Sequence, residues 1–151
     1  MTAFSFRLEK VLRWRQAKME LEQFALHRLA AEYARWDLRL AEIEIARRHA
    51  EQLVRSSGPV EGSDLAALAR YQQHLRDEKE AAVAHRRNCG QRMEQQRTLL
   101  LAARREFRLL EKLRQVRRAE WETAVNREFE MLAAETYLAQ WAPRQHREPQ
   151  Q

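Results

Sequence analysis

The stretch SSGPVEGSD, residues 56–64, decides the fold of this 151-residue chain. It holds two of the chain's three glycines and the only proline before Pro143. Gly58-Pro59 stops a helix, and Ser63 or Asp64 can cap the next one by accepting from its free N–H groups. The stretch therefore predicts a turn between two helices.

On the N-terminal side of this turn, apolar residues recur at alternating spacings of four and three, the pattern of a heptad seam. The seam positions are Leu8, Leu12, Arg15, Met19, Glu22, Leu26, Leu29, Tyr33, Trp36, Leu40, Ile43, Arg47, Ala50 and Val54. Eleven of these fourteen are apolar, and no proline or glycine interrupts them. This pattern predicts one helix from about residue 5 to residue 55.

A second, weaker seam follows the turn, and ten of its fourteen positions are apolar. Its positions are Leu65, Leu68, Gln72, Leu75, Lys79, Ala82, Arg86, Cys89, Met93, Gln96, Leu100, Ala103, Phe107 and Leu110. It predicts a helix over 65–141, which Gly90 could bend because glycine costs about 1 kcal/mol relative to alanine inside a helix. Pro143 should end this helix, and residues 143–151 are predicted to be a disordered tail.

Each seam needs a cover, so the fold class predicted is all-α, a single antiparallel coiled-coil hairpin over residues 1–142. With the turn near residue 60, the numbers of facing residues should add to about 120, so that residue 9 faces residue 111. The second helix is longer than the first. Residues 113–141 should form a C-terminal overhang whose apolar side needs another partner.

Composition and charge narrow the function classes. Three glycines, three prolines and 33% charged residues are typical of a long helix or coiled coil rather than a globule. A net charge of +6 favours acidic partners. The single cysteine excludes an intrachain disulfide and suits a reducing compartment. We find no signal peptide and no membrane-spanning run, and so expect a cytoplasmic protein.

No motif for catalysis or metal binding emerges from the chain. The five histidines show no metal-ligand spacing, and His85 with Cys89 makes only an i, i+4 half-site. A seam role for Cys89 is the simpler interpretation. There is no phosphate-binding loop and no nucleophile motif, so we expect no cofactor, no metal and no enzymatic activity.

Basic and aromatic residues gather at what we call the open end, the end of the hairpin away from the turn, comprising residues 4–15 and 104–121. Residues 7–15 carry a net +3 and residues 104–118 a net +5. Aromatic residues beside arginines are typical of binding hot spots. The predicted partner-binding residues are Phe4, Phe6, Arg7, Lys10, Arg13, Trp14, Arg104, Arg105, Arg108, Lys112, Arg114, Arg117, Arg118 and Trp121. The alternatives are an ordinary solvated surface and an arrangement in which Phe4, Phe6 and Trp121 cover one another.

Two stretches resemble a known family. FSFRLEKVLRWRQ (4–16) and LEKLRQVRRAEW (110–121), with the long coiled-coil body between them, are similar to the FliJ family of flagellar export proteins. The matching positions are Phe4, Phe6, Leu8, Val11, Leu12 and Arg15 in the first motif and Leu110, Leu113, Arg114, Arg117 and Trp121 in the second. The chain after Trp121 gives no clear match.

The resemblance implies a two-helix coiled coil like the central stalk of rotary ATPases, inserted into the hexameric ring of the export ATPase (FliI-like). It also implies contacts with the export-gate membrane protein (FlhA-like) and with export chaperones, hence peripheral association at the inner membrane. Two other interpretations stay open: the stalk of a non-flagellar type III secretion system, and a self-associating coiled-coil scaffold or chaperone. Nucleic-acid binding is not expected, because no groove-reading module is recognisable.

Overall fold

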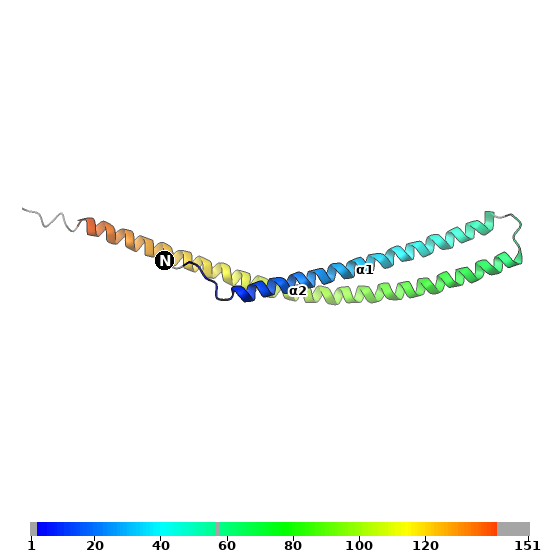
Figure 1. The fold of residues 1–151 in the computed structure, drawn as a ribbon, viewed down its shortest axis with the longest axis horizontal. Helices are drawn as coiled ribbons and strands as arrows, with labels where there is room; N and C mark the ends of the chain where they lie inside the picture. Colours follow the sequence, from blue (N-terminus) through cyan, green and yellow to red (C-terminus); the bar gives the residue numbers. More distant parts are fainter. Residues whose placement is uncertain (1–2, 57, 142–151) are drawn as a thin grey trace, which may run out of the picture. The chain divides into compact units, whose positions relative to one another are not determined.

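The computed structural model describes residues 3–56 and 58–141. They form two helices, α1 (Glu9–Ser56, 48 residues) and α2 (Gly62–Trp141, 80 residues), and no strand occurs in these ranges. The helices are antiparallel and joined by the predicted turn (Figure 1). The all-α hairpin with a longer second helix is therefore confirmed. Pro143, His146 and the predicted tail 143–151 lie outside the described residues.

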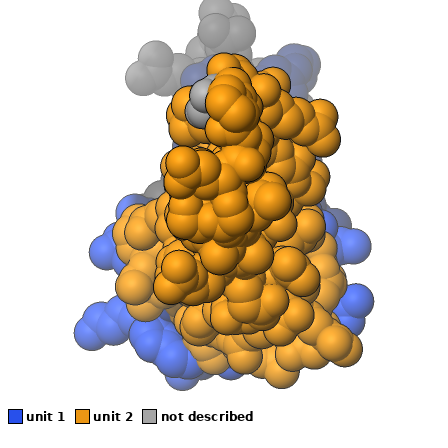
Figure 2. Space-filling model, turned by 90° about the vertical axis from the view of Figure 1, so that its right-hand side faces the viewer, with its two compact units in different colours: residues 1–16, 105–151 blue, residues 17–104 orange. Residues whose placement is uncertain are grey.

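The chain divides into two compact units, coloured separately in Figure 2. Unit 1 comprises residues 1–16 and 105–151, and unit 2 comprises residues 17–104. Each unit contains a piece of α1 and a piece of α2. The two are described separately below, and the assignment of residues 1–142 to one domain stays a prediction.

The turn is built as the sequence indicates, with one shift. Gly58 adopts φ +86°, a left-handed conformation that side chains disfavour. α2 begins at Gly62, three residues before the predicted start. The Asp64 carboxylate accepts from the Glu61 N–H at 3.3 Å, while the Asp64 N–H donates to the Glu61 carbonyl at 3.1 Å. Asp64 thus caps from inside the first turn, so the helix begins earlier than predicted.

The predicted start of the first helix, about residue 5, is wrong because α1 begins at Glu9. Phe4 and Phe6 are half-buried whereas Ala3, Ser5 and Arg7 are exposed, an alternation with period 2. That period belongs to an extended chain, in which every second side chain shares a face. The N–H of Glu9 donates to the Phe6 carbonyl at 3.0 Å, and the helix starts there.

Both predicted seams form the contact between the helices. The seven buried apolar residues among those described all lie on them: Leu12, Ile43, Leu75, Ala82, Cys89, Leu100 and Ala103. In unit 2, Ile43, Leu75 and Ala82 form the core cluster, against which Trp36, Leu40 and Ala46 pack. α2 runs through Gly90 without interruption.

Each polar residue that interrupts the second seam has a polar partner on α1. In unit 2 the Gln96 amide donates to the Glu22 carbonyl at 3.1 Å, and the Gln72 amide donates to Glu51 at 3.4 Å. Outside the seam positions, in unit 1, Arg114 lies 3.2 Å from Glu9. The residue numbers add to 118, 123 and 123 for these pairs, close to the predicted 120.

Candidate partner-binding surface at the open end

The basic stretch of α2 in unit 1 presents three cations on one face. Arg105, Arg108 and Lys112 are spaced by three and four, which places them on the same side of the helix. This side is opposite the seam positions Phe107 and Leu110, and all three cations are exposed. Within residues 3–56 and 58–141 none of the three pairs with a carboxylate. No carboxylate of the described residues therefore compensates their charge.

Four other predicted cations have acidic neighbours. Glu9 lies 3.8 Å from Arg13 and 3.2 Å from Arg114. Further along α2 two more pairs form within the helix, Arg117 with Glu120 at 2.8 Å and Arg118 with Glu122 at 3.0 Å. Exposed pairs of this kind contribute roughly 0–1 kcal/mol each. They lower the local positive charge and leave less of it for a partner.

The remaining predicted cations differ in position. Arg7 and Lys10 are exposed at the start of the chain and have no carboxylate partner in the described part of it. Arg104 is half-buried and is the last residue of unit 2, so it is described with that unit. Of the predicted cations in the described part of unit 1, Arg7, Lys10, Arg105, Arg108 and Lys112 are thus the ones without a carboxylate partner.

The two phenylalanines of the N-terminal segment pack onto α2 within unit 1. The rings of Phe4 and Trp121 have centroids 5.9 Å apart and are tilted by 54°. Phe4, Phe6 and Trp121, with Leu8 and Leu113, line an open groove of about 870 Å³ that also contains Arg117. These aromatics are half-buried rather than fully presented. The covered part of α2 therefore reaches Trp121, beyond the predicted limit at residue 113.

Trp14 differs from these aromatics because its side chain is 56% exposed. It lies off the seam, as predicted. The Arg15 guanidinium lies 4.7 Å from the Trp14 ring centroid, within cation–π range. Arg15 also forms an ion pair with Glu106 of α2. Arg15 therefore links Trp14, at the surface of unit 1, to an ion pair between the two helices.

The sequence-based prediction of this surface did not include its two glutamates. Glu9 and Glu106 each receive an arginine from the other helix, and Arg15 is the seam interruption that pairs with Glu106. A usable signal was present, since the numbers of Arg15 and Glu106 add to 121. A charged seam residue opposite a residue of opposite charge predicts an ion pair between the two helices.

The helix beyond Trp121 has an exposed, aromatic and acidic character. Between residues 122 and 141 four glutamates stand against one arginine. Apolar side chains more than half exposed are Phe129, Met131, Leu132, Tyr137, Leu138 and Trp141. The rings of Tyr137 and Trp141 are 6.4 Å apart. This segment is the uncovered part of the predicted overhang.

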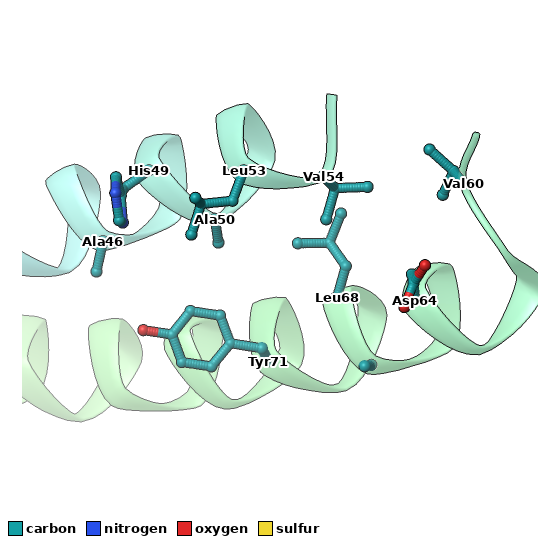
Figure 3. A pocket seen from close by; sticks show the side chains of 10 residues that line it. Ala46, His49, Ala50, Leu53, Val54, Val60, Asp64, Leu68 and Tyr71 are labelled. Carbon is teal, nitrogen blue, oxygen red and sulfur yellow. The ribbon is translucent and has the colours of Figure 1, made fainter. Parts of the chain in front are cut away.

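A second open groove lies in unit 2 between the helices beside the turn (Figure 3). His49 and Leu53 approach it from α1, and Leu68 and Tyr71 approach it from α2. Small residues at Ala46, Ala50 and Ala67 leave it unfilled; its volume is about 560 Å³. It contains no paired acid and base and no cluster of metal-binding groups.

His85 and Cys89 have structural roles in unit 2. The His85 ring stacks on Trp36 with centroids 4.7 Å apart and planes 9° from parallel. The Cys89 thiol donates to the Leu29 carbonyl at 3.3 Å, and burial raises its pKa. No group of three metal-binding residues exists among the residues described. Over the same residues, neither helix is both long and apolar enough to cross a membrane.

The chain matches no protein-family model, no curated protein and no solved structure.

Proposed function

We propose that this chain is a non-catalytic stalk of a type III protein-export ATPase, most simply the flagellar one. The observation that carries the proposal is the open end of the hairpin. There, exposed cations that form no ion pair within the described residues share unit 1 with Trp14, which is 56% exposed. These cations are Arg105, Arg108 and Lys112. The FliJ-like motifs fall on the same part of the chain, at residues 4–16 and 110–121.

The charge arrangement suits insertion into a ring lined by acidic loops. Three like charges along one helix face attract an acidic partner over about a Debye length, ~8 Å at physiological salt. The aromatic side chains supply the apolar anchor that charge alone does not give. The paired arginines, such as Arg114 on Glu9, keep the two helices aligned and contribute less to the partner.

In this role the chain performs no bond chemistry. Its continuous helices, 48 and 80 residues long, provide a stiff element whose end occupies the ring. Occupation promotes ring assembly and couples ATP hydrolysis in the ring to export. Contacts with the export gate and with chaperones follow from the same family resemblance and are part of the proposal.

The test is to mix the chain with the cognate export ATPase and measure hexamer formation and ATP hydrolysis together. We expect the wild-type chain to raise both. R105E/R108E/K112E should abolish the effect, because it reverses the face that meets the ring. R70E/R76E/R87E is the matched control: it changes the charge equally, on exposed cations of unit 2. Circular dichroism checks that both variants remain helical.

An ATPase whose assembly and rate do not respond to the wild-type chain at any concentration would refute the proposal. Equal losses with the two triple variants would refute the assignment of the working end. Loss of the effect at raised salt is expected as well, since exposed charges are screened.

A further inference from the structure

The outer face of α1 in unit 2 carries a second heptad stripe, in addition to the seam that packs on α2. Its positions, spaced alternately by four and three, are Ala17, Leu21, Phe24, Arg28, Ala31, Arg35, Leu38, Glu42, Ile45, His49 and Gln52. All are exposed, and Leu21, Phe24, Leu38 and Ile45 are between 63% and 69% exposed. Single exposed leucines are ordinary on a protein surface, but four large apolar residues in heptad register form a helix-packing stripe.

The outer face of α2 in the same unit differs. Its corresponding central positions are Arg70, Asp77, Ala84, Gln91 and Thr98, all exposed and none a large apolar residue. The outer faces of both helices are exposed to water, yet only the outer face of α1 carries large apolar residues at these positions. Exposure to solvent therefore does not explain the apolar stripe on α1. The difference indicates that α1 packs on a further helix through residues 17–52.

We propose that this further helix is the α1 of a second copy of the chain, packed antiparallel through the outer stripe. In an antiparallel coiled coil each seam residue of one helix faces a seam residue of the other helix. In the alignment that we propose, the numbers of facing stripe residues add to about 66. Leu21 of one copy faces Ile45 of the other. Arg28 faces Leu38, and Phe24 faces Glu42. The Arg28 stem lies along the leucine while its guanidinium reaches Glu42 of the second copy.

Charges beside the stripe favour this register. Glu20 and Arg48 flank the stripe at equivalent positions, and the alignment places Glu20 of each copy opposite Arg48 of the other. In the free chain Arg48 contacts Glu44 at 3.6 Å, an exposed pair that contributes little and can be exchanged. Shifting the alignment by one heptad would instead bring Lys18 opposite Arg39. A parallel pair would bring each Arg28 and each Arg35 against its own counterpart.

Small residues allow close approach at the centre of this contact. The two-fold axis falls near residue 33, where Ala31 on the stripe and Ala34 beside it are both exposed. Glu32, which would meet its counterpart there, lies 3.6 Å from Arg92 of its own chain, so its charge is compensated. This inference does not depend on the proposed export role, because it uses unit 2 and not the open end.

Sedimentation equilibrium of the full chain from about 1 to 100 µM is the first test, a range that detects micromolar dimers. The wild-type chain should dimerise. L38E should raise the dimer dissociation constant by about a hundredfold or more, since each dimer buries two copies of Leu38. A84E, on the polar face of α2, is the matched control and should leave the constant unchanged. A monomer at every concentration, or association insensitive to L38E, would overturn the proposal.

Charge exchange tests the register without touching the apolar residues. E20R alone and R48E alone should each weaken the dimer, and the double variant E20R/R48E should restore it. Failure of the double variant to recover would rule out the proposed alignment, even if L38E unfolds and gives no information.

Cross-linking tests the direction. A34C should cross-link through a short bismaleimide, because residue 34 lies at the two-fold axis. Q52C should not, because its two copies would be about 57 Å apart at ~1.5 Å per residue along antiparallel helices. The native Cys89 is only 1% exposed and should not react. A cross-link at Q52C would indicate a parallel pair and overturn the proposal.

Discussion

Gly90→Ala should stabilise the protein, although Gly90 is half-buried on α2 beside the seam. A Cβ at this position would lie 3.5 Å from Cε2 of Tyr33, an ordinary van der Waals contact. The substitution therefore meets no steric barrier. Glycine inside a helix is about 0.8–1.0 kcal/mol less favourable than alanine, so the free energy of unfolding should rise by about 1 kcal/mol. For a chain of this size that raises Tm by roughly 2–4 °C.

The measurement is urea unfolding followed by circular dichroism at 222 nm, with thermal melts in parallel. Gly58→Ala is the informative comparison, because it adds the same methyl group where no atom lies within 4 Å but φ is +86°. There the left-handed backbone disfavours a side chain by about 1–2 kcal/mol, so the same change should destabilise. A lower midpoint for Gly90→Ala would show that Tyr33 cannot accept the methyl, and the packing argument for this part of unit 2 would fail.

Three further outcomes follow from the packing. Leu75→Ala should lower the free energy of unfolding by about 2–5 kcal/mol, because Leu75 is 5% exposed in the core cluster. In the same urea titration Leu101→Ala should change it by under about 0.5 kcal/mol, because Leu101 is 51% exposed. The Cys89 thiol should react with Ellman's reagent far faster in urea than in buffer. Burial raises the pKa of the folded-state thiol above the ordinary 9.0, so the contribution of the neutral thiol to stability is complete below pH 9.0 and is lost as the pH rises through the folded-state pKa. Thermal melts of wild type and Cys89→Ala at alkaline pH should show this loss in the wild type alone. Gln96→Leu should cost about 1–3 kcal/mol, because it leaves the Glu22 carboxylate without the Gln96 donor at the seam. Gln96→Leu with Glu22→Leu removes both side-chain partners and should recover most of that cost in a double-mutant cycle.

Much of the hairpin was predictable because it depends on periodicity, which a sequence displays directly. The seams at 8–54 and 65–110 needed only the spacing of apolar residues, and every buried apolar residue among those described lies on them. The start of α1 was not predicted correctly. The prediction of a helix over residues 5–8 overlooked the spacing of two between Phe4 and Phe6. Both phenylalanines lie on an extended segment and line one groove with Trp121.

The net positive charge of the candidate surface was predictable from the sequence, but its ion pairs were not. Counting charges in 104–118 gave a net positive stretch, but the count cannot say which arginines are neutralised. Arg114 pairs with Glu9 from a hundred residues away, while Arg105 and Arg108 have no such neighbour in the described chain. The distinction depends on which side of α2 faces α1, and only the packed hairpin determines it.

The apolar residues on both sides of α1 raise the question of why one side packs on α2. Size complementarity within unit 2 supplies a reason. The inner side carries the large residues Tyr33 and Trp36, and α2 opposes them with small ones. A Cβ added at Gly90 would lie 3.5 Å from the Tyr33 ring, and Trp36 packs against the cluster that contains Ala82. The outer stripe offers no aromatic side chain at those levels, so it cannot fill the space beside Ala82 and Gly90. If that space selects the inner face, Tyr33→Ala with Trp36→Ala should weaken the hairpin and leave contacts made through Leu38 and Ile45 to dominate. We then expect the double variant to lose cooperative unfolding and still to associate in sedimentation experiments. A monomer in sedimentation would show that the outer stripe cannot replace the seam as a packing surface.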